Sequence, residues 1–106
     1  MDRSAAIERL ATRLRDASAR ADWDLLERAV RELGPQLQAL AELRHGGWSE
    51  RERAALARLR AAHDGAARAG AEATSLLRAQ LGEMRDNKEG WMAYALAGEL
   101  EAGSPP

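Results

Sequence analysis

The fold is decided by residues 22–40, which read DWDLLERAVRELGPQLQAL. Their large apolar residues recur at alternating spacings of three and four, which places them on one face of an α-helix. These residues are Trp23, Leu26, Val30, Leu33, Leu37 and Leu40. Asp22 precedes them as an N-cap, because its carboxylate can accept the free N–H groups of the first turn. The pattern predicts the main core helix. We expect Gly34 and Pro35 to kink this helix but not to end it, since the stripe keeps its phase across them.

A second helix is predicted before this stretch, over residues 4–20. It repeats the same spacing on one apolar face, formed by Ile7, Leu10, Leu14 and Ala17. After residue 40, His45, Gly46 and Gly47 indicate a loop, and Ser49 with Glu52 has the spacing of a capping box. A third helix should therefore begin near Ser49.

The third helix is predicted to reach at least Met84, with large apolar residues at both ends and a shallow trough of small ones between. The trough comprises Gly65, Ala66, Ala69, Gly70 and Ala73. Trp48 lies just before the cap, and its staple partner is Arg53, so any contact there is aromatic-to-guanidinium packing rather than an apolar staple. Residues 86–88 are predicted to form a weak boundary, after which residues 89–100 are predicted to form a short fourth helix. Gly90 and Gly98 each cost that helix about 1 kcal/mol relative to alanine.

Composition places the chain in the all-α class. Only four of the 106 residues are β-branched, and such residues are the ones that fill strands. We predict an antiparallel bundle of three to four helices, or a long-helix hairpin, as one domain over residues 1–102, with a disordered tail at 103–106. The N-terminus lacks an apolar signal-peptide core, and no stretch is long enough to span a bilayer, so we expect a cytoplasmic protein without membrane insertion.

Several function classes find no support in the residues. The formal net charge of −1 argues against direct binding of nucleic acid. There is no cysteine, no glycine-rich phosphate motif, and no exposed nucleophile on a sharp turn. His45 and His63 have no convincing metal-ligand partners. Lys88 is the single lysine, so a dicarboxylate-binding site of the chorismate-mutase type would be poorly organised. We therefore expect no enzyme activity, catalytic residue, metal or cofactor.

Two features allow both a structural and a functional interpretation. The small-residue trough either receives Leu37 and Leu40 of the preceding helix or forms a groove for an amphipathic partner segment. The C-terminal aromatic cluster around Trp91 and Tyr94 either docks on the bundle or occupies a groove until a partner displaces it. Residues alone leave both pairs of alternatives open.

Three short pieces of the sequence resemble the FliT-like flagellar export chaperones. They are residues 21–26 with 34–37 (ADWDLL and GPQL), the WSE opening of the long helix at 48–50, and the run from Met84 and Arg85 through Lys88 to Ala93 and Tyr94. The resemblance covers most of the chain between residues 18 and 100. The trough is richer in alanine here than is typical of the family. Little linker precedes the last helix, so the cover is either a separate lid or a continuation of the third helix.

The resemblance implies a cytoplasmic chaperone that binds the amphipathic C-terminal region of the filament-cap protein and prevents premature assembly. It also implies the export gate or the export ATPase as further partners. The family binds its client on an apolar surface of the second and third helices, with the C-terminal helix as a cover. By position, the client surface corresponds to Leu37, Leu40, Leu56, Leu59, Ala66, Ala73 and Leu77, and the cover to Trp91 and Tyr94.

Two alternatives remain beside this interpretation. The FlgN-like chaperones of hook–filament junction proteins share the long-helix hairpin and a C-terminal tyrosine. In the other alternative, the chain is a self-associating helical adaptor that is not flagellar, and the exposed part of its apolar stripe forms a homodimer interface.

Overall fold

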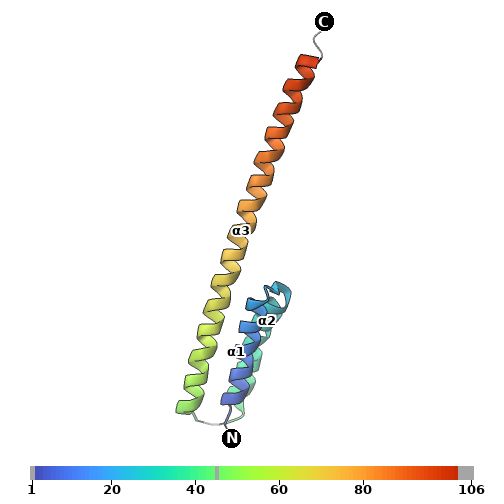
Figure 1. Ribbon diagram of the computed structural model, residues 1–106. Helices are drawn as coiled ribbons and strands as arrows, with labels where there is room; N and C mark the ends of the chain where they lie inside the picture. Colours follow the sequence, from blue (N-terminus) through green and yellow to red (C-terminus); the bar gives the residue numbers. More distant parts are fainter. Residues whose placement is uncertain (1, 45, 103–106) are drawn as a thin grey trace. The chain divides into compact units, whose positions relative to one another are not determined.

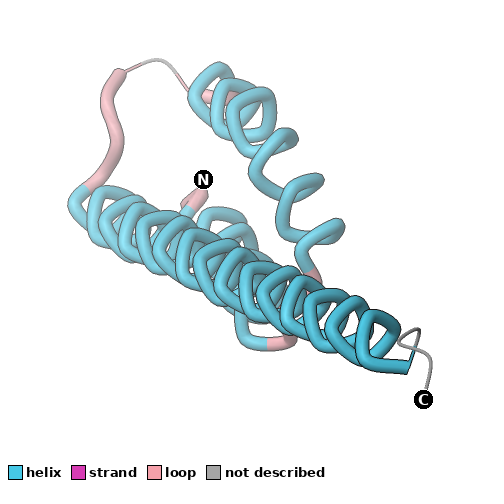
Figure 2. The backbone as a smooth tube through the Cα atoms, turned by 90° about the horizontal axis from the view of Figure 1, so that it is seen from above, coloured by secondary structure: helices cyan, strands magenta, loops and turns pink. Residues whose placement is uncertain are grey.

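The computed structural model describes residues 2–44 and 46–102, with side chains up to residue 98. The described chain is all-α: α1 is Ser4–Ala19, α2 is Trp23–Glu42 and α3 is Glu50–Ala102, and no strand occurs among these residues (Figure 2). This confirms the predicted fold class. The expected tail at 103–106 and His45 of the predicted loop lie outside the described residues.

The chain forms two compact units, where the sequence predicted one domain over 1–102. The first unit is Met1–Ala71 and the second is Glu72–Pro106. The first unit contains α1, α2 and the first 22 residues of α3 as a three-helix bundle in which α1 and α2 lie antiparallel (Figure 1). The second unit contains the remaining residues of α3.

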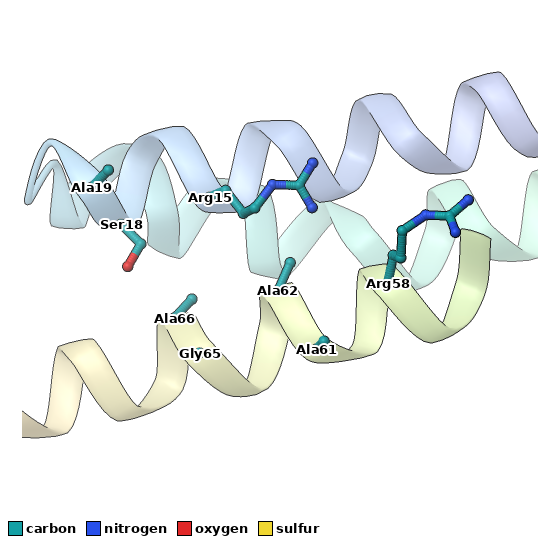
Figure 3. A pocket seen from close by; sticks show the side chains of 8 residues that line it. All are labelled: Arg15, Ser18, Ala19, Arg58, Ala61, Ala62, Gly65 and Ala66. Atoms are coloured by element: carbon teal, nitrogen blue, oxygen red, sulfur yellow. The ribbon is translucent and has the colours of Figure 1, made fainter. Parts of the chain in front are cut away.

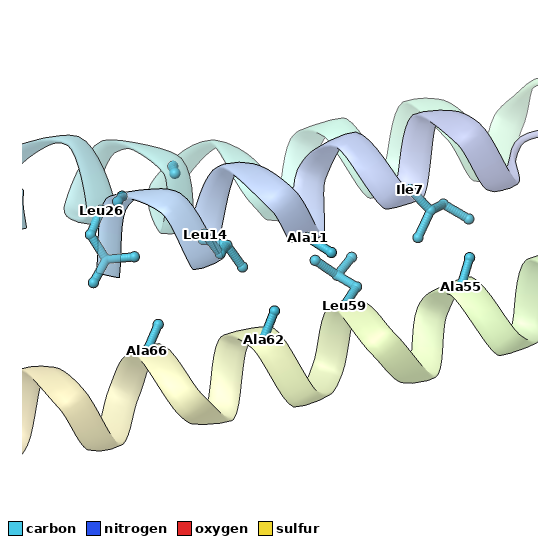
Figure 4. Packing of buried hydrophobic residues seen from close by; sticks show 10 residues of the cluster. Ile7, Ala11, Leu14, Leu26, Ala55, Leu59, Ala62 and Ala66 are labelled. Atoms are coloured by element: carbon cyan, nitrogen blue, oxygen red, sulfur yellow. The ribbon is translucent and has the colours of Figure 1, made fainter. Parts of the chain in front are cut away.

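The core of the first unit is built mainly from small side chains. Its ten buried apolar residues include six alanines (Figure 4). They are Ile7, Ala11, Leu14 and Ala17 of α1, Leu26 and Ala29 of α2, and Ala55, Leu59, Ala62 and Ala66 of α3. Helices approach most closely where the facing side chains are small. Six alanines and four large residues therefore share the space between the helices.

The prediction that α2 carries the main core face is wrong in part. Of its predicted stripe only Leu26 is buried, while Trp23 and Val30 are each 38% exposed. Leu33, Leu37 and Leu40 pack at the edge of the cluster as partly buried residues. The buried residues of α2 are Leu26 and Ala29, and its bulkier residues lie along the margin of the cluster. The helix does continue through Pro35, as predicted.

The turn between α1 and α2 follows the hydrogen-bond pattern of a Schellman motif. The N–H of Asp22 donates to the carbonyl of Ala17 at 2.9 Å, and the N–H of Ala21 donates to that of Ser18 at 3.1 Å. This motif places Ala21 at a φ of 53°, in the left-handed region that usually holds glycine. Asp22 then caps α2 by accepting the N–H of Leu25 at 3.2 Å, which confirms the predicted N-cap.

The predicted boundary between a third and a fourth helix is wrong. Residues 86–88 are helical, and α3 extends to Ala102. Asp86, Asn87 and Lys88 are polar but keep their backbone N–H groups, so they do not interrupt helical hydrogen bonds as a proline would. Polarity alone therefore does not end this helix.

Candidate partner-binding surfaces

A buried ion pair joins the N-terminus to the start of α3. The Nε of Arg3 donates to Oε2 of Glu52 at 2.7 Å, and its Nη2 donates to Oε1 at 3.0 Å. The backbone N–H of Arg3 also donates to Oε2 at 2.9 Å. The side chains are only 2% and 0% exposed. Such fixed two-pronged geometry is what arginine and a carboxylate make best.

The same arginine also reaches the end of α2 and the loop. Its Nη1 donates to the carbonyl of Leu40 at 2.8 Å, and its guanidinium lies 4.0 Å from the centroid of the Trp48 ring. Arg53 donates to the Trp48 backbone carbonyl at 2.7 Å, and the guanidinium that packs on the ring is that of Arg3. Arg3 thus connects all three helices at one end of the bundle.

Glu52 has two structural roles, of which the sequence predicted one. The reciprocal capping box is confirmed: the N–H of Ser49 donates to Oε1 of Glu52 at 2.8 Å, and the N–H of Glu52 donates to Oγ of Ser49 at 3.1 Å. The hydrogen bonds from Arg3, and next the one from the Ser49 N–H, hold the pKa of this carboxyl far below its usual range. We assign these groups to stability, since they leave no open position for a substrate.

Part of the predicted trough lines a shallow hollow between α1 and α3. The hollow has a volume of about 490 Å³ (Figure 3). Its lining residues are Arg15, Ser18, Ala19, Arg58, Ala61, Ala62, Gly65 and Ala66. Arg58 pairs with Glu8 across the helices. Leu37 and Leu40, the predicted occupants of the trough, are not among the residues that line it.

The predicted client surface in the first unit is largely part of its core. Leu59 and Ala66 are each only 3% exposed, so neither is available to a partner unless the bundle opens. Their assignment to an open groove is therefore wrong in this structure. Leu37, Leu40 and Leu56 are partly buried against the same cluster. The physical reason is that α1, rather than a partner, covers this face of α3.

The predicted residues of the second unit are in a different environment. Ala73 is half-buried, Leu77 is 55% exposed, and Trp91 and Tyr94 are 73% and 76% exposed. Trp91 and Tyr94 contact each other edge to face, with ring centroids 6.4 Å apart and planes at 82°. Within the second unit both rings are thus open to solvent, and their role as a cover stays a prediction.

The second unit carries a broad set of exposed apolar side chains. At 100° per residue most of them share one side of the helix, and we call this set the open face. It consists of Leu76, Leu77, Leu81, Met84, Trp91, Met92 and Tyr94. Each is more than half exposed. Leu77, Trp91 and Tyr94 were predicted from the sequence as binding residues, whereas the other four were missed, although their spacing already put them on the same side.

Chemistry-bearing residues form no evident reaction centre in the described part of the chain. No group of three or more His, Asp or Glu side chains is placed to hold a metal ion there. His63 has its Nδ1 3.9 Å from a carboxylate oxygen of its neighbour Asp64 on the surface. Within the same residues, no helix combines the length and apolarity needed to cross a bilayer.

Comparisons with known proteins return nothing: no family model, curated protein or solved structure matches this chain. A function must therefore be argued from the chain's own surfaces. Seven of the eleven exposed large apolar side chains among the described residues belong to the open face of the second unit.

Proposed function

We propose that this chain is a non-enzymatic export chaperone of the FliT-like kind, and that its open face binds an amphipathic segment of a client protein. The client implied by the resemblance is the C-terminal region of a filament-cap protein. The observation that supports binding is that Leu77, Met84 and Trp91, at successive spacings of seven, are all more than half exposed. A stripe with this period is the surface that an amphipathic partner helix packs against.

The exposed area fits this proposal. With about 150 Å² for each fully exposed large side chain, the open face presents on the order of 600 Å² of apolar surface. Contiguous patches of that size are at the upper limit for soluble monomers and commonly mark interaction sites. A partner in a standard interface covers about 800 Å² on each side. Holding a client in this way needs no chemistry, because binding lowers the concentration of free client by mass action.

The second candidate is self-association through the same face. Between residues 72 and 98 three cationic side chains stand against four anionic ones. Two copies of this segment would therefore meet with little net repulsion, so net charge does not oppose a homodimer in the absence of client. This candidate corresponds to the helical adaptor considered from the sequence.

The test compares Leu77→Asp with Ala93→Asp, which lies on the opposite side of the same helix. We expect Leu77→Asp to weaken binding of a purified filament-cap C-terminal segment at least tenfold in calorimetry, because an unpaired carboxylate would be buried in the interface. Ala93→Asp should bind as the unmodified chain does, with equal helicity by circular dichroism. Equal losses in both variants, or no binding by the unmodified chain, would refute the proposal.

Light scattering separates the two candidates. The chaperone predicts that added client forms a complex with one copy of the chain. A stable dimer that ignores client and dissociates in Leu77→Asp would instead establish the adaptor.

A further inference from the structure

The charged side chains beside the open face are sorted by sign across it. At about 100° per residue, Lys88, Arg85 and Arg78 lie about 40°, 100° and 120° to one side of Met84, which is in the middle of the face. They are all the cationic residues between 72 and 98, and we call this side the basic flank. All three are exposed, and none forms an ion pair with another described residue.

The opposite side of the open face carries only acidic charge. Glu83 and Glu72 lie about 100° and 120° from Met84 in the other direction, and we call this side the acidic flank. The remaining acids of the segment, Asp86 and Glu89, lie about 160° and 140° from Met84, on the back of the helix. Charges that flank an apolar stripe meet those of a partner helix and set which partner binds. The open face therefore selects a partner by charge as well as by apolarity.

A second copy of the chain is a poor match for these flanks. Antiparallel pairing of two open faces would bring basic flank against basic flank and acidic flank against acidic flank. Parallel pairing in register would place Lys88, only about 40° from the middle of the face, against the same lysine of the second copy. It would also offer only two carboxylates to the three cations of the basic flank. Like charges held together weaken an interface, so a different helix fits this face better.

An anionic lipid surface is a poor match as well. A helix that lies on such a surface carries lysine and arginine throughout its polar side, because both edges of its apolar face meet the same negative charge. Here the acidic flank would be repelled wherever the basic flank is attracted. The charge pattern therefore favours a partner whose own two edges differ in sign.

We propose that the segment bound by the open face is an amphipathic helix with carboxylates along one edge of its apolar stripe and cationic side chains along the other. Its carboxylates pair with Lys88 and, at a spacing of seven residues, with Arg78 and Arg85. Its cationic edge pairs with Glu83 on the acidic flank. A helix with one sign on both edges would satisfy one flank and be repelled by the other. This inference rests on the proposed function, to which it adds the charge pattern of the client.

The test titrates the full-length chain with three synthetic helical peptides of equal length and identical leucine stripe. The bipolar peptide carries glutamates on one edge of the stripe and lysines on the other, and the two remaining peptides carry only glutamates or only lysines on both edges. Sedimentation first fixes concentrations at which the chain and each peptide are monomeric. In calorimetry at low salt, we expect the bipolar peptide to bind roughly tenfold more tightly than either of the others. The factor follows from several ion pairs at the interface rim, each of which changes from attraction to repulsion.

Two double variants with the same change of net charge form the matched pair. Glu72→Lys with Glu83→Lys makes both flanks basic, so the tightest ligand should change from the bipolar peptide to the peptide with glutamates on both edges. Asp86→Lys with Glu89→Lys places the same charges on the back of the helix and should keep the preference for the bipolar peptide. All four positions are exposed, and both variants should show equal helicity by circular dichroism.

The possible failures are distinguishable. Equal affinity for all three peptides would overturn the charge pattern but leave the proposed function standing, whereas no binding of any peptide would overturn both. The same switch of preference in both double variants would show that net charge, rather than the flanks, decides the ligand. A dimer of the unmodified chain that excludes the bipolar peptide would assign the face to a second copy. Binding to vesicles of anionic lipid that blocks the bipolar peptide would assign it to a membrane surface.

Discussion

Leu59 and Leu77 were both predicted to bind a client, and the structure gives them opposite environments. Leu59 is 3% exposed and points toward Ala11 in Figure 4, whereas Leu77 is 55% exposed. Truncating each to alanine should therefore have very different effects on the free energy of unfolding. We expect a loss of about 3–4 kcal/mol for Leu59→Ala and a change within about 0.5 kcal/mol for Leu77→Ala.

The magnitude for Leu59 follows from its neighbours. Leucine-to-alanine changes in cores cost about 2–5 kcal/mol, with the larger values where the cavity cannot close. Ala11, Ala55 and Ala62 belong to the same buried cluster and have no side-chain length with which to fill a void. A unit of 71 residues has a total stability of about 4–10 kcal/mol. Leu59→Ala should thus bring the first unit close to unfolding.

Urea denaturation followed by circular dichroism and tryptophan fluorescence measures both changes. Sedimentation should first identify a concentration at which the chain is monomeric. Self-association would bury Leu77 and so add an interface contribution to the measured free energy of unfolding. Leu59→Met is the control, since a swap that conserves volume costs less than about 1.5 kcal/mol. A loss above about 1.5 kcal/mol for Leu77→Ala in the monomer would refute the conclusion that this face is unpacked, and a negligible loss for Leu59→Ala would refute the core.

Three further predictions concern the turn, the cap and the buried ion pair. Ala21→Gly should raise the free energy of unfolding by about 1 kcal/mol, because glycine adopts the φ of 53° without strain; a loss in urea denaturation would contradict this. Asp22→Ala should lower it by about 1 kcal/mol through loss of the N-cap, with Asp24→Ala, which caps nothing, as the comparison. Glu52→Gln should lower the thermal midpoint far more than Glu50→Gln, because it leaves Arg3 buried without its counter-charge. Since the folded-state pKa of Glu52 is depressed, its contribution to stability is full above the ordinary carboxyl range and is lost as pH falls below it, so the thermal midpoint of Glu52→Gln should depend less on pH in the acid range than that of the unmodified chain.

Local signals in the sequence predicted the helical class and the helix starts. The capping residues Asp22, Ser49 and Glu52 act over three positions, so a single stretch contains all the information they need. The pairing of Arg3 with Glu52 spans 49 positions. Both residues also look like ordinary surface charges in a chain rich in arginine and glutamate. No local pattern distinguishes a pair that becomes buried from the many that stay in water.

The prediction of the core from the sequence was wrong in part, because periodicity gives most weight to large side chains. The stripe from Trp23 to Leu40 is the clearest in the chain, yet the buried contacts run through alanines that a hydropathy pattern scarcely registers. Close approach selects for small residues at the contact, and the large leucines then pack at its margin. In an alanine-rich bundle, the strongest apolar stripe therefore need not mark the tightest interface.

For the open face, periodicity predicts which side of the helix is apolar but not whether that side is covered. The spacing of Leu77 and Met84 predicts which side of the helix is apolar, and because α3 continues through residues 86–88, Trp91 lies on that side too. Periodicity carries no information on what covers such a face, because a helix of the same chain, a second copy and a client all require the same stripe. Burial of Leu59 and exposure of Leu77 on one helix distinguish the two cases. A binding surface can thus be separated from a core only where the structure shows which part of the stripe is already covered.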